Sequence, residues 1–224
     1  MGHAKETWDK VEEFVSGYGE IILPPLVTKE IKADFKHLPY SLSRYKFAGK
    51  MLEGKKSVIE VGCNAGFKTM MLSQFVETVV GLDYSESAIK FANENYADEK
   101  RSYLCADITQ MEPFKEKVDA AVSLDVIEHI PQEDEDTFIA AIANNLKEDG
   151  VCIIGTPNIT ASAYQSEETK ISHINLYSHQ RLRDLMGKYF DNVFMFGMND
   201  EVVHTGYPAM SHYIIAMGVG LKRK

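Results

Sequence analysis

The stretch SVIEVGCNAGFKT, residues 57–69, joins a short apolar run to a glycine-containing turn. The β-branched residues of Ser57–Val61 predict a buried strand. A helical pattern follows the turn, with apolar residues recurring from Met70 to Phe75. A strand that passes into a helix through glycines leaves unpaired backbone N–H groups open to a ligand. The stretch therefore predicts the ligand-binding turn of an α/β protein.

The glycine spacing argues against a dinucleotide site. The pattern G-x-G-x-x-G counted from Gly62 requires glycines at 64 and 67, where the chain has Asn64 and Phe67. The run instead resembles motif I of class I S-adenosylmethionine-dependent methyltransferases, (D/E)-x-G-x-G-x-G, with Glu60 as its acid and Asn64 in place of the middle glycine. An acid at the strand end suits a ligand that carries cationic or hydroxyl groups.

A second strand, predicted over residues 77–83, ends in Asp83. Asp83 lies about twenty residues after Gly62, the offset at which an acid meets ribose hydroxyls in nucleoside sites. Tyr84 follows, and Ser85 is a candidate N-cap for a helix over residues 86–96. An acid in this position is also the second hallmark of the family that motif I resembles.

Two more strands are predicted over residues 102–108 and 118–124. The resemblance implies that Asp107 accepts a hydrogen bond from the adenine amino group and that Ile108 packs on the ring. The segment DVIEHI, residues 125–130, matches a signature that many small-molecule methyltransferases carry after their fourth strand. It lacks the Asp/Asn-Pro-Pro-aromatic turn of amino-base methylators and the cysteine nucleophile of cytosine-carbon methylators.

The resemblance covers residues 57–157 and implies an α/β, Rossmann-like methyltransferase fold. The expected sheet has seven mostly parallel strands, an antiparallel last strand and helices on both faces. We expect one domain over residues 1–224, with a helical cap (1–55), a cofactor-binding core (56–157), and an acceptor loop with a C-terminal hairpin (158–224). The expected cofactor is S-adenosyl-L-methionine, giving S-adenosyl-L-homocysteine, with contacts from Arg44, Glu60, Gly62, Asn64, Gly66, Asp83, Tyr84, Ser85, Asp107, Ile108, Leu124 and Asp125.

Composition narrows the class of partner. The chain has 224 residues and a formal net charge of −9, which argues against nucleic acid or an anionic membrane surface as a partner. Three cysteines without metal-ligand spacing fit a reducing cytoplasm, and no long apolar run predicts a membrane span. We therefore expect a cytoplasmic protein that acts on a small-molecule acceptor. The sequence leaves its oligomeric state open.

Two helices are predicted before the first strand, over residues 4–19 and 41–52, with Pro24 and Pro25 between them. Helices in this position often cap the cofactor in the class that the chain resembles. Arg44 could then reach the methionyl carboxylate through charge-assisted hydrogen bonds. A surface arginine on a packing helix is an equally good interpretation.

The polar segment 159–177 predicts a functional loop. Its end, SHINLYS (residues 172–178), resembles the H-x-N-x-[FY]-[ST] element of methyltransferases that act on sugars and other small hydroxyl acceptors, and Ser178 is the expected N-cap of the next helix. The connection 197–208 between the last two predicted strands is a candidate lid. The expected acceptor-binding residues are Asn158, Tyr164, His173, Asn175, Tyr177, His204 and Tyr207.

Methylation of a hydroxyl requires a base, for which histidine is suited near neutral pH. His173 and His129 are the competing candidates, and Asp125 could orient a histidine or contact the cofactor. No metal ligand set is apparent from the spacing, so a metal-free mechanism is expected. The main hypothesis is an O-methyltransferase of a sugar, a nucleotide-activated sugar or another surface polysaccharide precursor, which includes a phosphoramidate-type one. The alternatives are a quinone or other small-metabolite O-methyltransferase, and a non-catalytic cofactor-binding scaffold.

Overall fold

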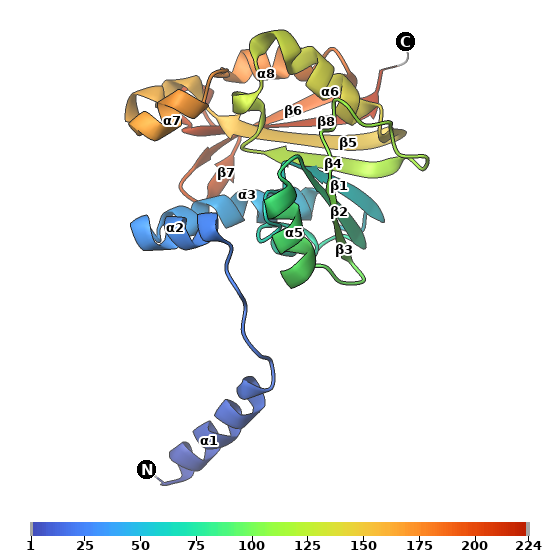
Figure 1. Ribbon diagram of the computed structural model, residues 1–224. Coiled ribbons are helices and arrows are strands. Elements are labelled where there is room, and N and C mark those ends of the chain that lie inside the picture. The colour runs from blue at the N-terminus through green and yellow to red at the C-terminus, as the bar shows by residue number, and fades with distance from the viewer. Residues whose placement is uncertain (1, 223–224) are drawn as a thin grey trace.

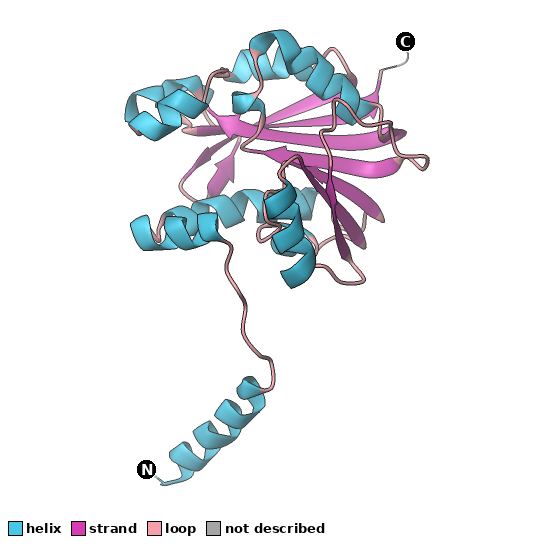
Figure 2. Cartoon of the chain, in the orientation of Figure 1, coloured by secondary structure: helices cyan, strands magenta, loops and turns pink. Residues whose placement is uncertain are grey.

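The computed structural model describes residues 2–222 and forms one sheet with helices on both faces (Figures 1 and 2). The strands are β1 Ser57–Val61, β2 Thr78–Asp83, β3 Arg101–Cys105, β4 Val118–Leu124, β5 Leu146–Pro157, β6 Phe190–Asn199, β7 Val202–His204 and β8 Tyr213–Leu221. The α-helices are α1 Gly2–Ser16, α2 Pro25–Ala33, α3 His37–Met51, α4 Thr69–Leu72, α5 Glu86–Asn95, α6 Glu135–Ala143, α7 Glu167–Ser172 and α8 His179–Met186. Short 3-10 helices include η1, Ile127–His129.

The strand order is β3-β2-β1-β4-β5-β8-β6-β7. The pairs among β1 to β5 are parallel, while β8 runs antiparallel to both β5 and β6. This confirms the predicted α/β sheet with its antiparallel last strand. The predicted number of seven strands is wrong, because the connection expected as a lid over 197–208 contains an eighth strand. That strand, β7, pairs with the end of β6, Gly197 opposite His204.

Successive apolar residues along each strand point to opposite faces of the sheet. Ile59 and Ala121 face α6 and α8, whereas their neighbours Val58 and Ala120 face α3 and α4. Since both faces are buried, the central strands β1 and β4 are mostly apolar, which is why they were readable from the sequence. The carboxyl ends of the parallel strands are left free to hold polar residues.

The N-terminal part differs from the expectation. α1 lies apart from the body (Figure 1), with its apolar side chains exposed, including Trp8 at 65% and Phe14 at 69%. Pro25, expected to interrupt helical structure, begins the unpredicted helix α2, where the missing N–H of proline costs nothing. α2 packs on α3, so these two helices are the part of the predicted cap that lies against the domain. No helix of residues 2–222 has the length and apolar character that crossing a membrane requires.

Candidate functional site

The turn after β1 adopts the left-handed backbone that its sequence suggests. Gly62 and Gly66 have φ of +83° and +77°, and Asn64 between them has φ of +50°. A Cβ at Gly62 would lie 2.2 Å from Val126 Cγ2, so this glycine also permits close packing against the segment after β4. Asn64 can replace the middle glycine because asparagine tolerates this conformation better than most residues.

Asp83 connects the glycine turn to the end of β2. One carboxylate oxygen accepts a hydrogen bond from Asn64 N at 2.8 Å, and the other accepts one from Ser85 N at 2.9 Å. Ser85 caps α5, as predicted, by accepting from Ala88 N at 3.4 Å. Tyr84, which lies between Asp83 and Ser85 in sequence, is 83% exposed. The sequence offset therefore brings an acid, the turn and an exposed aromatic ring together at one edge of the sheet.

The other predicted cofactor positions differ in accessibility. Asp107 holds its own turn, accepting from Thr109 N at 2.9 Å, and Ile108 is buried beside it. Glu60 is also buried and accepts a hydrogen bond from Tyr45 Oη at 2.8 Å. Burial raises the pKa of Glu60. Its carboxylate thus ties α3 to β1, and Leu124 is likewise buried in the core, so a cofactor contact at Glu60 or Leu124 would be through the backbone.

Arg44 and Asp125 form an ion pair at the carboxyl end of β4, in which Arg44 is buried and Asp125 is partly exposed. Arg44 Nη1 lies 2.8 Å from both carboxylate oxygens of Asp125, and its guanidinium stacks 3.8 Å from the ring centre of Tyr213. Burial alone would raise the pKa of Asp125, but the Arg44 charge outweighs it and holds that pKa below its ordinary value. Asp125 has φ of +60°, a strained conformation that this pairing stabilises.

His129 and His173 lie side by side, although one follows β4 and the other follows α7. Their ring centres are 4.9 Å apart. The loop is held in place because Asn175 N donates to Glu128 O at 3.1 Å and because His129 Nδ1 lies 2.8 Å from Ser172 O. Burial and the neighbouring His129 lower the pKa of His173. The two histidines that competed for the role of base therefore belong to one group.

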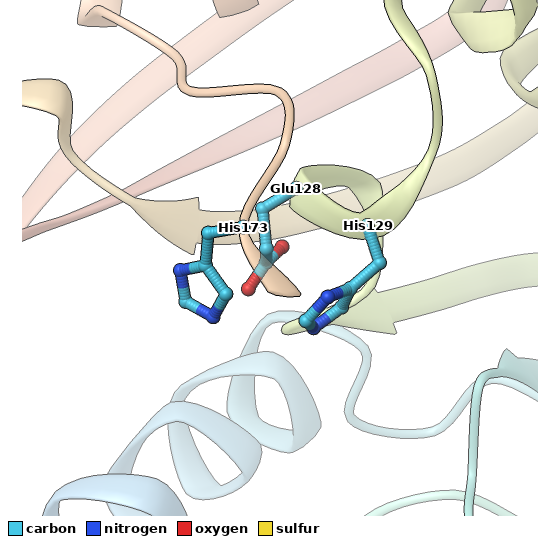
Figure 3. Close-up of side chains that lie close together, drawn as sticks. All are labelled: Glu128, His129 and His173. Atoms are coloured by element: carbon cyan, nitrogen blue, oxygen red, sulfur yellow. The ribbon is translucent and has the colours of Figure 1, made fainter. Parts of the chain in front are cut away.

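Glu128 is a site residue that the sequence analysis did not single out. It is fully buried between the two histidine rings (Figure 3). Oε2 accepts from Thr156 Oγ1 at 3.0 Å, while Oε1 has no hydrogen-bond partner among the described residues. Burial, and secondly the Asp125 carboxylate, raise the pKa of Glu128 to about 8. The signal in the sequence was its place between Asp125 and His129 directly after a buried strand.

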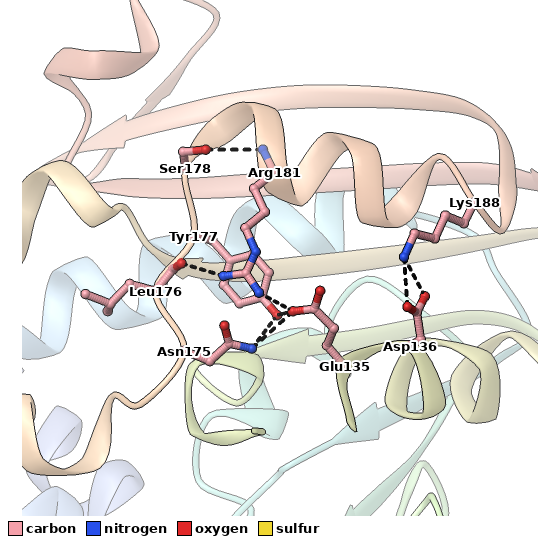
Figure 4. A network of polar contacts seen from close by, with 8 residues as sticks. All are labelled: Glu135, Asp136, Asn175, Leu176, Tyr177, Ser178, Arg181 and Lys188. Atoms are coloured by element: carbon pink, nitrogen blue, oxygen red, sulfur yellow. Dashed lines mark hydrogen bonds and ion pairs between the residues drawn. The ribbon is translucent and has the colours of Figure 1, made fainter. Parts of the chain in front are cut away.

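Three residues predicted to contact the acceptor have side chains with hydrogen-bond partners inside the protein, and an acceptor contact at these positions stays a prediction. Asn158 Nδ2 donates to Pro208 O and Ser211 O at 2.9 and 2.8 Å. Asn175 and Tyr177 are buried and donate to Glu135, at 3.2 and 2.6 Å, where Arg181 also pairs (Figure 4). Buried polar groups need such partners, so these side chains are engaged within the protein.

The remaining predicted acceptor residues lie on exposed segments. Tyr164 and Tyr207 are 90% and 71% exposed. Both ring nitrogens of His204 are engaged, one 2.8 Å from Asn199 Oδ1 and the other accepting from Gly206 N at 3.0 Å, so this histidine shapes the β6–β7 hairpin. Ser178 caps α8 by accepting from Arg181 N at 3.2 Å, as predicted.

Comparison with known proteins agrees with this geometry. Residues 59–154 match a family described as "Methyltransferase domain", which spans the glycine turn, Asp83 and the segment after β4. Residues 59–154 therefore carry a methyltransferase domain, and the fold around them is that of class I S-adenosylmethionine-dependent methyltransferases. The matched region coincides with the parallel half of the sheet, where the candidate site lies.

Structural matches to other methyltransferases extend over more of this chain than sequence matches do. The methyltransferase domain of bacterial CtHen1-C has a TM-score of 0.66 at 18% identity, over 81% of this chain and 99% of that one. A protein named "Ubiquinone biosynthesis O-methyltransferase" from Glaesserella parasuis serovar 5 is 31% identical, over 59% of this chain and 60% of its own length. The mitochondrial protein of that name from Bos taurus is 32% identical, over 52% of this chain and 32% of its own length. The matches thus span 60% and 32% of the length of these two relatives.

Proposed function

We propose that this methyltransferase transfers a methyl group to a hydroxyl oxygen of a small acceptor. One observation carries the proposal: Glu128, His129 and His173 gather just after β4, the strand that pairs with β1, and Val126 in the same segment packs against Gly62 of the glycine turn. Ligands of open parallel sheets bind at this edge, where the strand order reverses. The cofactor turn and a group of proton-accepting side chains therefore face the same region.

The described residues fit S-adenosylmethionine, which would supply an electrophilic methyl group on its sulfonium. Asp83 is placed to accept hydrogen bonds from ribose hydroxyls, and Asp107 with Ile108 to hold the adenine. Arg44 retains a buried Nε without a partner among the described residues, which suits the methionyl carboxylate. The backbone of the glycine turn leaves room for the ligand to approach closely.

A hydroxyl acceptor loses its proton as it is methylated. Positioning of the acceptor does most of the work in such an in-line displacement, and an imidazole near neutral pH can receive the proton. His129 and His173 are in contact with each other, so we assign the removal of this proton to the group that both form with Glu128 rather than to one histidine.

The relatives favour a phenolic acceptor of quinone type over a sugar precursor. The curated relatives named above are ubiquinone biosynthesis O-methyltransferases. The sugar hypothesis depended on the loop element that ends at Ser178, whose Asn175 and Tyr177 are buried and paired with Glu135. What supported a sugar, or a phosphoramidate-type precursor, was therefore the packing of the loop rather than a surface for an acceptor.

The test is a turnover assay with two panels of acceptors. The full chain is incubated with S-adenosylmethionine and either dihydroxylated aromatic compounds or nucleotide sugars, and both S-adenosylhomocysteine and the methylated product are measured by mass spectrometry. We expect product with the aromatic panel. Product with nucleotide sugars alone would restore the sugar hypothesis, and cofactor binding without any product would support the non-catalytic scaffold.

A further inference from the structure

Three side chains with metal-binding atoms converge at the end of β4. Glu128, His129 and His173 each offer one ligand atom, and these atoms all lie within 4.8 Å of one another (Figure 3). Glu128 and His129 come from η1, and His173 directly follows α7. His129 is exposed, which leaves a path from solvent to the group. One carboxylate and two imidazoles form a ligand set found in catalytic zinc and non-haem iron sites.

Glu128 supplies a second observation that points to a cation. Its side chain is fully buried, and Oε1 has no hydrogen-bond donor among the described residues. The buried cation Arg44 pairs through Nη1 with Asp125, 2.8 Å from both carboxylate oxygens, and makes no hydrogen bond to Glu128. A buried carboxylate oxygen without a partner is costly. In Figure 3 this carboxylate points into the space between the two imidazole rings, where a bound cation would satisfy it.

His129 is oriented as metal-binding histidines usually are. Such a ring donates one N–H to a protein acceptor and keeps the lone pair of its other nitrogen for the metal. His129 Nδ1 lies 2.8 Å from Ser172 O, which fixes a proton on Nδ1 and leaves Nε2 free. Gln165 Nε2 lies 3.2 Å from His173 Nδ1. In this amide orientation Nδ1 accepts the hydrogen bond, whereas a 180° flip of the amide, which exchanges its nitrogen and oxygen, would give His173 the tautomer of His129.

We propose that Glu128, His129 and His173 bind one divalent transition-metal cation, and that its remaining coordination positions take the acceptor oxygen. The second part rests on the proposed function. Two imidazoles favour Zn²⁺, Co²⁺ or Mn²⁺ over Mg²⁺, which prefers oxygen ligands. Coordination lowers the pKa of a bound hydroxyl. Its proton then leaves to solvent, the oxygen lone pair forms the new C–O bond, and the breaking C–S bond returns its electrons to sulfur, so the sulfonium becomes a neutral thioether.

The first test measures metal binding alone. Chelator-treated full-length protein is titrated calorimetrically with ZnCl₂, CoCl₂ and MgCl₂, and Co²⁺ is also followed by its visible absorption. We expect one Zn²⁺ or Co²⁺ per chain, bound at least about 100-fold more tightly than Mg²⁺. Glu128→Gln and His173→Ala should each weaken Zn²⁺ binding by about 100-fold or more, since loss of a direct ligand exceeds the 10–100-fold cost of losing an outer partner.

The control is His37→Ala, which removes an exposed histidine at the start of α3 and should leave Zn²⁺ affinity unchanged. Because Glu128→Gln alters a buried residue, thermal unfolding checks its fold, and His173→Ala on the loop provides the independent variant. The proposal is overturned if the parent protein binds no Zn²⁺, or if both variants bind it as tightly as the parent.

The second test separates this proposal from the proposed function. After chelation, S-adenosylmethionine should still bind, while methyl transfer to the aromatic acceptor should cease and return with Zn²⁺, Co²⁺ or Mn²⁺. Undiminished methyl transfer by the chelated protein would overturn the metal site and leave the methyltransferase function intact. Zn²⁺ binding that is lost in the variants, with no methyl transfer to any acceptor, would keep the metal site and reject the function.

Discussion

Because Arg44 and Asp125 differ in burial, we expect substitution of one or the other to lower the free energy of unfolding by different amounts. The side chain of Arg44 is 8% exposed and that of Asp125 is 32% exposed. Asp125→Asn keeps a residue that tolerates the φ of +60°, yet it leaves a buried guanidinium without its counter-charge. Removal of one partner of a buried pair costs about 3–5 kcal/mol, and partial exposure reduces our expectation to about 2–4 kcal/mol. Arg44→Met should cost less, about 1–2 kcal/mol, since the remaining carboxylate can hydrate.

A double-mutant cycle measures this coupling. Urea unfolding is followed by far-ultraviolet circular dichroism, because the one tryptophan, Trp8, lies exposed in the detached helix α1 and reports poorly on the core. The double variant should be more stable than the sum of the single losses predicts, by about 1–3 kcal/mol. The exposed pair Lys29–Glu168 is the matched control and should show less than about 1 kcal/mol. Additivity at Arg44 and Asp125 within about 0.5 kcal/mol would refute the buried-pair argument.

Three further predictions follow from the same structure. Asp83→Asn should weaken S-adenosylmethionine binding by about 10–150-fold, since a hydrogen bond to a charged acceptor contributes about 1.5–3 kcal/mol; unchanged affinity in calorimetry would place the ribose elsewhere. Gly62→Ala should lower the free energy of unfolding by about 1–3 kcal/mol through its φ of +83° and its contact with Val126, and Val126→Ala in the same chain should recover part of that loss in urea unfolding. Burial opposes ionisation of Asp119, but the Lys147 side chain and then the backbone N–H groups of Ser57 and Lys56 lower its pKa to about 2. The stability that Asp119 contributes is therefore complete above its ordinary pKa of 3.8 and is lost as the pH falls toward 2. Asp119→Asn should therefore cost about 1–2 kcal/mol at pH 7 and less at pH 3, and an equal cost at both would contradict this origin.

The fold was readable from the sequence where burial on both faces produces long apolar runs. β1 and β4 are strands of this kind. The start of α5 could also be predicted, because Ser85 places an N-cap hydroxyl one residue before the helix. The elements that were missed depend on contacts made far along the chain. The three-residue strand β7 exists because it pairs with the end of β6, and α2 exists because it packs on α3.

The acceptor loop shows that polar residues alone do not identify a binding surface. Asn175 and Tyr177 have the composition of a binding surface, and their spacing matches one. In the structure they are buried because Glu135, in the first turn of α6, needs donors there, and together they fasten the loop to that helix (Figure 4). A sequence shows that a polar side chain will have a partner, but it does not show whether that partner is a ligand or another part of the chain.

The partners of the histidine cluster could not be predicted from the sequence either. Here, however, the side chains that the fold brings together form a candidate ligand site. His129 and Ser172, the residue before His173, are 43 positions apart in sequence, and their contact follows from the way the loop returns over η1. Spacing along the chain therefore argued against a metal, since it weighs only ligands that are near in sequence. Asn175 and Tyr177, which were predicted to contact the acceptor, fasten the loop and so help to hold His173 against Glu128 and His129. If Glu135→Gln loosens that fastening, the effect should be greater on Zn²⁺ affinity than on cofactor affinity, because the glycine turn and Asp83 lie on strands that the loop does not support.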